Sequence, residues 1–433
     1  MTVVVTGRLA AAAAAAALLV TLVLPSWFAV IVLTCALAAA LCIDLGMAGQ
    51  APDLALSRAS LTTVRLGRSV GVELVAVNTG TRTLRGTLWD DWPDSARAQT
   101  RPHQVDLAPG AQARFHTTLN PTYRGDRVAG PVTVRLLGPL GLAGRQTRFS
   151  VPARVRALPA FRSERLLRSK VRRLHHLDGR NLADRRGQGT EFDSFRKYVA
   201  GDDVRAIDWR ATARATDVLV RTWRPERNRH VALLLETGRV SAGRVGAGTR
   251  LDASIEAALL LGALAAAAGD SVDLLAFDRQ PRAEVRGVGG KGLQLKLMHA
   301  MAGITPTLVD TDSSGLVRAV IQRTRRRSLV VWFTGLDGAT VEENVLPVLP
   351  VLAQRHRVLI VSVTDPDVAA AAARRDTLSD LGLAAAAESV LAERAVVQES
   401  LRRSGVAVIA APPERLPEAL ADEYLELKQS GAV

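Results

Sequence analysis

Residues 329–333 read LVVWF, an uninterrupted apolar run of the kind that forms a fully buried strand. Comparable runs recur along the second half of the chain, with helical patterns between them. The runs are VALLL at 231–235, VDLLAF at 272–277, VLIVSV at 358–363 and VAVIA at 406–410, and helices are predicted near 252–268, 293–302, 314–325, 341–354, 386–403 and 416–428. Repeated strand-helix units predict a doubly wound, largely parallel α/β sheet over residues 230–433. Sites in such a fold follow the carboxyl ends of the strands, here at 236–248, 278–282, 334–338 and 364–367.

The region before this sheet, residues 159–229, is predicted to be a basic linker that contains an unusual motif. Residues 154–229 hold 20 Lys or Arg against 10 Asp or Glu, a net charge of +10 out of +14 for the whole chain. Its first part, 161–177, has apolar residues at helical spacing with arginines between them, which predicts an amphipathic helix. A basic helix can lie on anionic lipid or on an acidic protein, or it can pack on the domain behind it with its arginines in water.

The second part of this region, residues 187–214, interleaves carboxylates, arginines and aromatic residues at close spacing. The pattern is typical of a networked loop or a docking surface, because ion pairs hold a shape when they are bidentate and partly desolvated. Its aspartates also suggest a metal-dependent nuclease, but Arg205 and Arg210 fill the gaps between them and are expected to neutralise them by pairing. We expect a structural and docking cluster beside the first strand of the α/β domain, formed by Asp202, Asp203, Arg205, Asp208, Trp209 and Arg210. A loop that only pins the motif onto the sheet is the alternative.

Residues 53–158 have a different texture, with short alternating runs separated by Gly, Pro and Asn. Several short strands with regular turns indicate a small β-sandwich, and the strands are predicted at 69–77, 84–88, 113–119, 132–136 and 146–151. The stretches Tyr123-Arg124-Gly125-Asp126 and Gly138-Pro139-Leu140-Gly141-Leu142 are interpreted as an ordered loop and a bend. His103 and His116 lie on different predicted elements, which disfavours a metal site between them.

The first 45 residues predict two transmembrane helices that form a tight hairpin. Residues 9–24 and 27–43 are uncharged apolar runs, and each approaches the roughly 20 residues that span hydrocarbon. Arg8 before the first run, with Arg58 and Arg65 after the second, would hold both ends on the positive-inside face of a multi-pass cell-membrane protein, so that the soluble domains are cytoplasmic. The alternative is a signal peptide, against which the second apolar run argues.

The motif and the α/β domain together resemble a known family. The phrases Tyr198-Val199-Ala200-Gly201-Asp202-Asp203 and Ile207-Asp208-Trp209-Arg210 are similar to those of the bacterial domain-of-unknown-function family fifty-eight (DUF58). The apolar hairpin, the β-domain and the ending at 423–428 fit the same family. The resemblance implies a membrane-anchored protein with a von Willebrand factor A-like domain, usually paired with a MoxR-type AAA+ ATPase.

Von Willebrand A domains commonly bind magnesium at an Asp-x-Ser-x-Ser loop after the first strand, completed by a Thr and by an Asp after the fourth. This sequence departs from that pattern, because its first loop reads Glu236-Thr237-Gly238-Arg239-Val240 and its later loop reads Thr334-Gly335-Leu336-Asp337. What remains is a degenerate oxygen site of Glu236, Thr237, Thr334 and Asp337, with Arg239 beside it as a competing charge. We therefore predict no metal and no cofactor, and we expect partner binding on this face to rest on salt bridges and shape.

These observations favour a non-enzymatic membrane adaptor over two other classes of protein. The adaptor would hold a MoxR-type AAA+ ATPase or its client protein at the cytoplasmic face, with membrane lipid as a further partner. The alternative is binding of anionic lipid or nucleic acid through residues 154–229, although nucleic acid is the less expected partner. A hydrolase that uses the aspartates of the motif finds no support, because no Ser-His-Asp set, Cys-His pair or His/Cys metal cluster accompanies them in the sequence.

Overall fold

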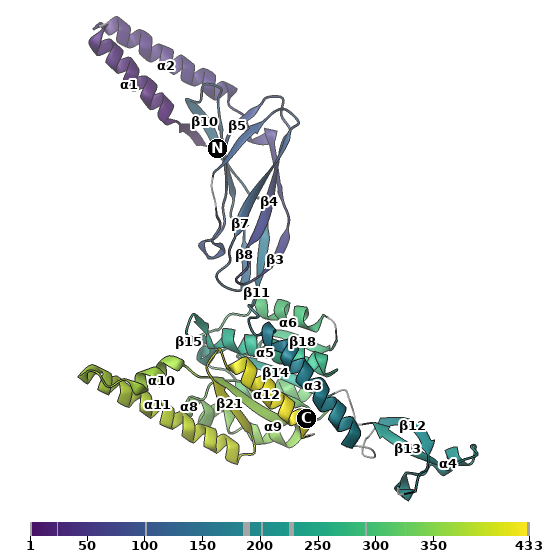
Figure 1. Ribbon diagram of the computed structural model, residues 1–433. Helices are drawn as coiled ribbons and strands as arrows, with labels where there is room; N and C mark the ends of the chain where they lie inside the picture. The colour runs from purple at the N-terminus through teal and green to yellow at the C-terminus, as the bar shows by residue number, and fades with distance from the viewer. Residues whose placement is uncertain are drawn as a thin grey trace. The chain divides into compact units, whose positions relative to one another are not determined.

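The computed structural model describes residues 2–23, 25–99, 102–184, 191–200, 202–224, 229–290, 292–324 and 326–430. The chain divides into two compact units, Met1–Ala160 and Phe161–Val433 (Figure 1). The boundary falls just after the predicted β-domain, and the basic segment belongs to the same unit as the α/β domain.

The first unit begins with a short strand and two apolar helices. Strand β1 (Thr2–Val5) is followed by helix α1 (Gly7–Leu22) and helix α2 (Trp27–Met47), and the two helices lie side by side in Figure 1. Among the described residues, α2 is the one helix long and apolar enough to cross a membrane, with 21 residues and a mean hydropathy of 2.5. Within these two helices, which are fully described, Asp44 is the only buried residue.

Three sheets make up the rest of the first unit. Their orders are β1-β10-β9-β5-β6, β2-β4-β7 and β3-β11-β8, and only β3 and β11 pair in parallel among the described strands of this unit. The strands are β2 (Leu54–Arg58), β3 (Leu61–Arg65), β4 (Val70–Asn78), β5 (Leu84–Asp90), β6 (His103–Leu107), β7 (Gln112–Leu119), β8 (Gly125–Val128), β9 (Val132–Leu137), β10 (Ala143–Phe149) and β11 (Arg154–Leu158), with 3₁₀ turns at Ala51–Asp53 and Asp94–Ala96. The first two sheets share one apolar core, which includes Leu74 of β4, Leu88 of β5 and Val134 of β9, and this is the arrangement of a β-sandwich.

The five strands expected from alternation occur as β4, β5, β7, β9 and β10. Strand β1 is not indicated by the sequence, because its residues are apolar or β-branched throughout and run directly into the apolar helix α1. It pairs antiparallel with β10, so that Thr2 lies opposite Gln146 and Val5 opposite Ala143. The segment before the two apolar helices and a segment that follows them are therefore paired in one sheet.

The bend at residues 138–142 is fixed by the end of α2. The carboxylate of Asp44 is fully buried and accepts three backbone N–H bonds. The donors are Leu140 at 2.7 Å, Leu142 at 2.7 Å and Ala143 at 2.8 Å. From the residue before α1, the hydroxyl of Thr6 donates to the carbonyl of Gly141 at 2.6 Å. The interpretation of this stretch as an ordered bend is confirmed, and we call the three bonds to Asp44 the Asp44 latch.

The second unit is built on a six-stranded sheet of order β18-β17-β14-β19-β20-β21. Its strands are β14 (His230–Glu236), β17 (Ser271–Phe277), β18 (Pro281–Val288), β19 (Leu329–Phe333), β20 (Arg357–Val363) and β21 (Ala407–Ala411). All neighbouring pairs in this sheet are parallel except β17 and β18, which are antiparallel. The five predicted strands are confirmed, and the order is that of a doubly wound sheet with an antiparallel strand at one edge.

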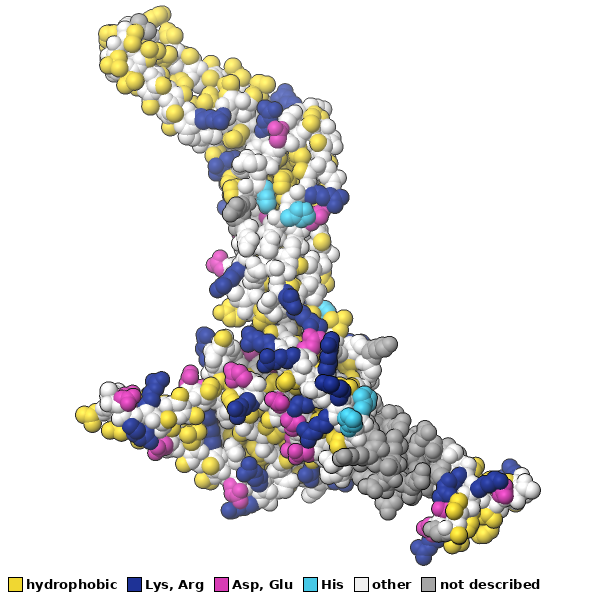
Figure 2. Space-filling view, in the orientation of Figure 1, with side chains coloured by type: hydrophobic (Ala, Val, Ile, Leu, Met, Phe, Trp, Pro, Cys, Tyr) yellow, Lys and Arg dark blue, Asp and Glu magenta, His cyan; other side chains and the backbone are white. Residues whose placement is uncertain are grey.

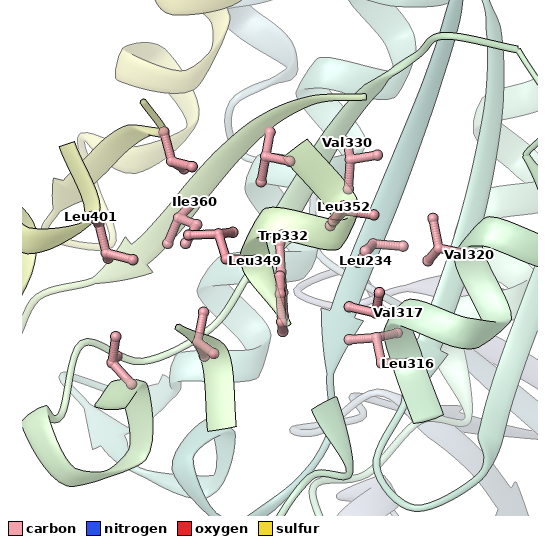
Figure 3. Packing of buried hydrophobic residues seen from close by; sticks show 14 of the residues in the cluster. Leu234, Leu316, Val317, Val320, Val330, Trp332, Leu349, Leu352, Ile360 and Leu401 are labelled. Atoms are coloured by element: carbon pink, nitrogen blue, oxygen red, sulfur yellow. The ribbon is translucent and has the colours of Figure 1, made fainter. Parts of the chain in front are cut away.

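Helices cover both faces of this sheet. They are α3 (Glu164–Asp184), α5 (Arg250–Ala267), α6 (Leu293–Ala302), α7 (Ser313–Arg323), α8 (Gly338–Thr340), α9 (Leu349–Arg355), α10 (Pro366–Ala373), α11 (Leu378–Arg403) and α12 (Leu416–Gln429), with a π-helical turn at Val341–Val345, a 3₁₀ turn at Arg239–Ala242 and a small hairpin of β15 (Arg244–Val245) and β16 (Gly248–Thr249). Alternate residues of β14 face opposite layers, and Leu234 joins Trp332 in a core with residues of α7, α9 and α11 (Figure 3). Helix α5 contacts β14, and together with α3 and α12 it forms the helical layer on the opposite face of the sheet.

The basic helix α3 packs on the α/β domain that follows it. Leu174 is fully buried, and Lys170 donates to Glu418 at 3.2 Å and to Asp422 at 2.9 Å, both on α12. Arg173 also bonds Asp422, at 2.7 Å. Part of the basic face of this helix is therefore paired with acidic residues of the same unit.

Candidate functional site

The predicted docking cluster lies on a β-hairpin, which we call the arm (residues 191–224). Strands β12 (Glu191–Lys197) and β13 (Leu219–Arg224) pair antiparallel, and a 3₁₀ turn (Val204–Ala206) and helix α4 (Trp209–Thr212) lie between them. Ile207 forms a bridge to Val220, whose side chain is buried, so the tip of the arm is tied to β13. Residues 187–190 and Gly201 of the predicted motif lie outside the described residues.

Two of the aspartates of the motif hold the turn before α4. Asp202 accepts two bonds from the Arg196 guanidinium, at 2.6 and 2.5 Å, and one from the backbone of Val199 at 2.9 Å. These hydrogen bonds lower the pKa of Asp202 to about 2, and the bonds from Arg196 have a larger effect than the bond from Val199. Asp203 accepts the backbone N–H of Arg205 at 2.9 Å and so caps the 3₁₀ turn. Both carboxylates are bonded by donors of the arm itself.

The third aspartate, Asp208, caps helix α4. It accepts the backbone N–H of Ala211 at 2.9 Å, which is the bond that an N-cap aspartate typically makes. Its other oxygen accepts from Arg221 Nε at 2.8 Å. The backbone bond first, and then the Arg221 bond, lower the pKa of Asp208 below its usual value. This side chain is 8% exposed, so it serves the fold of the arm.

The pairing partners of the carboxylates differ from those expected. Sequence spacing suggests Arg205 and Arg210, but the ion pairs of the structure join Asp202 to Arg196 and Asp208 to Arg221. That prediction is wrong, because the arm is a hairpin whose strands β12 and β13 supply Arg196 and Arg221 to these carboxylates. A third pair joins Lys197 to Asp217 across the same hairpin at 2.6 Å.

The surface that remains exposed on the arm is apolar and basic. Trp209 is 67% exposed, and Val199 and Val204 are 62% and 60% exposed. The exposed arginines that form no ion pair among the described residues are Arg205, Arg210 and Arg214. Figure 2 shows apolar and basic side chains together on this part of the surface. Tryptophan and arginine are the residue types most enriched at binding hot spots, so this surface has the chemistry of a protein-binding site.

The second predicted site lies at the carboxyl edge of the sheet, where β14 and β19 end. Glu236 is buried, and Trp332 Nε1 donates to its carboxylate at 2.7 Å. Burial raises the pKa of Glu236 to about 7, so this group is partly protonated at neutral pH. Thr237 and Thr334 are buried as well, and the hydroxyl of Thr237 has no hydrogen-bond partner among the described residues. The structure thus brings three of the four predicted residues to one buried edge.

The fourth residue, Asp337, is directed to arginines. It lies 3.3 Å from Arg250 Nη1 and 3.9 Å from Arg394 Nη2. Val240 fills the neighbouring space, since a Cβ on Gly335 would lie 2.3 Å from Val240 Cγ1. Sequence reasoning missed both arginines, because they come from helices α5 and α11 and no local pattern links them to Asp337. No group of three or more His, Cys, Asp or Glu side chains suited to a metal ion occurs in the part of the chain that the structure describes.

These features define a multidomain protein with a doubly wound α/β domain, a motif-bearing arm and an apolar N-terminal helix. Residues 194–381, from β12 into α11, match the family model described as protein of unknown function DUF58. The resemblance to that family is confirmed for this part of the chain.

Similar sequences are found in mycobacteria. Uncharacterised proteins of Mycobacterium tuberculosis (strain H37Rv) and Mycobacterium bovis are each 27% identical over 192 residues, which cover 44% of this chain and 60% of theirs. The chain therefore spans 60% of the length of these relatives. A structure of Bacteroides uniformis β-glucuronidase matches with 13% identity and a TM-score of 0.16, over 72% of this chain and 36% of that chain.

Proposed function

We propose that this protein is a non-enzymatic, membrane-anchored adaptor whose arm docks onto an acidic surface of a partner protein. The observation that carries the proposal is the separation of roles within the arm. The carboxylates of Asp202, Asp203 and Asp208 accept hydrogen bonds from within the arm, whereas Trp209 and three arginines are exposed. An exposed tryptophan flanked by unpaired positive charge fits a partner groove that is apolar at its centre and acidic at its rim.

The proposed partner is a MoxR-type AAA+ ATPase, or a client protein that such an ATPase remodels. The partner class comes from the resemblance to DUF58, and the basic character of the arm is compatible with an acidic ATPase surface. The arm also forms the beginning of the segment that matches the DUF58 model, residues 194–381. An arm that is part of the family domain is a reasonable place for an interaction common to the family.

The α/β domain is proposed to be of the von Willebrand A-like type. The sheet order β18-β17-β14-β19-β20-β21, with β18 antiparallel at the edge, supports this assignment. At its carboxyl edge, Asp337 is engaged by Arg250, and Val240 fills the neighbouring space. A partner that approaches this edge would meet salt bridges and apolar side chains, as we expect for binding without a metal.

The proposed membrane topology is a hairpin in which both α1 and α2 cross the bilayer. Strand β1 precedes α1, its partner β10 follows α2, and the two strands pair in one sheet. Paired strands lie on the same side of a membrane, so the chain between them crosses an even number of times. A single crossing by α2 would separate β1 from β10, and cleavage after α1 would remove β1. Helix α1 has 16 residues and is about 24 Å long, so it requires some thinning of the roughly 30 Å hydrocarbon core.

The side of the membrane is proposed to be the cytoplasmic one, on the basis of the arginines next to the helices. Arg8 lies in the first turn of α1, and Arg82 donates to the carbonyl of Gly46 near the end of α2 at 3.3 Å. Arg58, which the sequence analysis counts with this group, is buried in the β-domain and pairs with Asp90. The positive flank supported by the structure is therefore formed by Arg8 and Arg82.

The alternative, binding of anionic lipid or nucleic acid through residues 154–229, has less support. Lys170 and Arg173 of α3 are paired with α12, which reduces the positive charge that this helix presents to a ligand. Arg165, Arg168 and Arg172 of α3 are exposed. The exposed arginines of the arm lie on either side of the exposed Trp209 in the sequence, which favours a protein partner.

The proposal is tested by affinity capture of the full-length tagged protein from detergent-solubilised membranes, followed by mass spectrometry. The arm variant is the double substitution Trp209→Ala and Arg210→Glu. The matched control carries Leu308→Ala and Arg402→Glu, which change a similarly exposed apolar side chain and an exposed arginine outside the arm. We expect the wild type and the control to capture a AAA+ ATPase, and the arm variant to capture at least tenfold less, as the loss of a hot spot of about 2 kcal/mol predicts.

Two results would contradict the proposal. Equal capture by the arm variant and the wild type, with equal melting temperatures, would show that the arm is not the docking surface. Failure of the wild type to enrich any AAA+ ATPase would reject the proposed partner.

A further inference from the structure

Helices α10 and α11 form a hairpin that extends from the α/β domain (Figure 1). Both helices line an open groove of about 590 Å³, which we call the α10–α11 groove. Its lining comes only from these two helices and from Arg374, the residue that follows α10. No residue of the arm takes part in it. The groove is therefore a surface feature separate from the docking surface proposed above.

Helix α10 is apolar on all sides, although none of its residues is buried. After Pro366 and Asp367 it consists of Val368 followed by alanines at 369–373. The helix is fully described, and each of its residues keeps some exposure to solvent. A helix that is hydrophobic all round is typically buried, and a helix of eight residues is too short to be stable alone in water. Helix α10 thus has the sequence of an element covered by more protein than α11 provides.

The groove residues of α11 belong to a stripe that is buried further along the same helix. They are Leu383, Ala386, Ala387 and Val390, which have the i, i+3, i+4, i+7 spacing of one helix face. Val397 follows Val390 by one heptad, so it lies on nearly the same side of the helix, and it is buried in the core on the sheet. Leu383 and Val390, in contrast, are 52% and 38% exposed. The half of the stripe that does not reach the sheet is therefore open to a partner.

The groove residues at α10 have the same spacing, and they carry opposite charges at the two ends. They are Asp367, Val368, Ala370, Ala371 and Arg374. Asp367 and Arg374 are the two charged residues of the groove lining, and both are exposed. Neither side chain forms an ion pair with a described residue. This face is thus negative at one end, positive at the other, and lined by small alanines at its midpoint.

From this pattern we infer that the α10–α11 groove is covered by the same groove of a second copy of the chain. A two-fold axis that passes between Ala370 and Ala371 sets the two α10 helices antiparallel. Asp367 of each copy then faces Arg374 of the other, because both residues lie at the same distance from the axis. The two hairpins together form a four-helix bundle, in which i, i+3, i+4, i+7 faces cover one another. The charge pattern is its own complement, and this favours a second copy over an unrelated partner.

The apolar and the charged residues of this interface have different roles. Exposed ion pairs contribute little free energy, so affinity comes from covering Leu383 and Val390. The charges instead fix the direction of packing. A parallel arrangement would bring the two Asp367 side chains together and the two Arg374 side chains together, and such like-charge contacts are unfavourable.

The first test is the molar mass of the full-length protein in density-matched neutral detergent, measured by sedimentation equilibrium. The groove variant is Leu383→Glu. Its matched control is Val396→Glu, which changes an exposed apolar residue of α11 that does not line the groove. We expect the wild type and the control to be dimeric. The groove variant should associate about tenfold more weakly or less, because its dimer would bury an unpaired carboxylate. Its circular dichroism should match that of the wild type, since Leu383 is half exposed in a single copy.

The second test concerns the direction of packing. Asp367→Arg and Arg374→Asp each make the facing charges alike, and each should weaken self-association by about tenfold. In an equimolar mixture of these two variants, one chain has positive charge at both ends of α10 and the other has negative charge at both ends. Both contacts of the mixed dimer are then ion pairs, so the mixture should associate as strongly as the wild type.

Several results would overturn the inference. A monomeric wild type would do so, and loss of ATPase capture by L383E would then assign the groove to that partner. A dimer that L383E leaves intact, or that V396E weakens equally, would place the contact between copies elsewhere. Charge variants that associate like the wild type, or a mixture that fails to recover, would reject the antiparallel two-fold arrangement.

Discussion

The Asp44 latch provides a direct test of how the apolar helices are joined to the β-domain. Asp44 Oδ1 accepts from Leu140, and its Oδ2 accepts from both Leu142 and Ala143. In the variant Asp44→Asn, the amide oxygen can replace only one of these two carboxylate oxygens. The side-chain orientation that loses fewer hydrogen bonds keeps those from Leu142 and Ala143. It turns the NH₂ group of the asparagine toward the N–H of Leu140.

The magnitude follows from these bonds. One buried N–H loses its acceptor, at about 1–3 kcal/mol, and two bonds change from charged to neutral acceptors, at about 0.5–1 kcal/mol each. We therefore expect the Asp44→Asn variant to be destabilised by about 3 kcal/mol. For a unit of about this size, 1 kcal/mol corresponds to roughly 2–4 °C, so the melting temperature of the first unit should fall by about 6–12 °C.

The assay is thermal unfolding of the full-length protein in detergent, followed by near-UV circular dichroism. The matched control is Asp106→Asn, because Asp106 is exposed and its pair with Arg85, at 3.4 Å, is a surface pair. Such a pair contributes less than about 1 kcal/mol, so the control should melt close to the wild type. If Asp44→Asn also melted within about 2 °C of the wild type, the three bonds would not hold the bend, and the reasoning would be refuted.

Three further predictions concern other parts of the fold. Glu236→Gln keeps an acceptor for Trp332 and removes an ionisation that burial opposes. Burial raises the pKa of Glu236 from 4.5 to about 7, so the wild type should be as stable as the variant below pH 4.5. As the pH rises through 7, the wild type should become less stable than the variant by up to about 3 kcal/mol. Urea unfolding at pH 4 and pH 8 measures this difference. The same difference in free energy of unfolding between variant and wild type at both pH values would contradict the raised pKa. Thr249→Ala removes the capping box of α5 and should lower the free energy of unfolding by about 1 kcal/mol in the same assay. An unchanged free energy of unfolding would show that the cap does not hold the start of this helix. Gly86→Ala places a Cβ 1.9 Å from the backbone oxygen of Arg135 and should destabilise the β-sandwich by about 3 kcal/mol or more, whereas soluble, wild-type-like expression would show that β5 and β9 can separate at this point.

The central part of the α/β fold is readable from the sequence, because a strand buried on both faces is a continuous apolar run. LVVWF and VLIVSV are of this kind, and both occur as strands. Strand β18, PRAEVRGV, is different, since an edge strand has one unpaired side and tolerates charged residues that conceal its pattern. Helix α11 also begins earlier than expected, at Leu378, because its first turns contain exposed leucines that form no simple amphipathic stripe.

The position of the arm motif could be predicted from its composition, whereas the roles of its residues could not. The division between capping aspartates and exposed arginines depends on the register of β12 against β13, which brings Arg196 and Arg221 to the carboxylates. The same holds at the carboxyl edge of the sheet. There, Asp337 meets arginines of two helices that only the tertiary fold places beside it.

The pairing of β1 with β10 has a consequence for the order of assembly. Thr2 is made before its partner Gln146, and both apolar helices and most of the β-domain lie between them in the chain. Contacts between residues so distant in sequence form slowly, so β1 is expected to join the sheet late. Until it does, β10 is an open edge strand that could pair with another chain. Insertion of the two helices into the membrane would bring β1 close to that edge and shorten the time for which it is exposed.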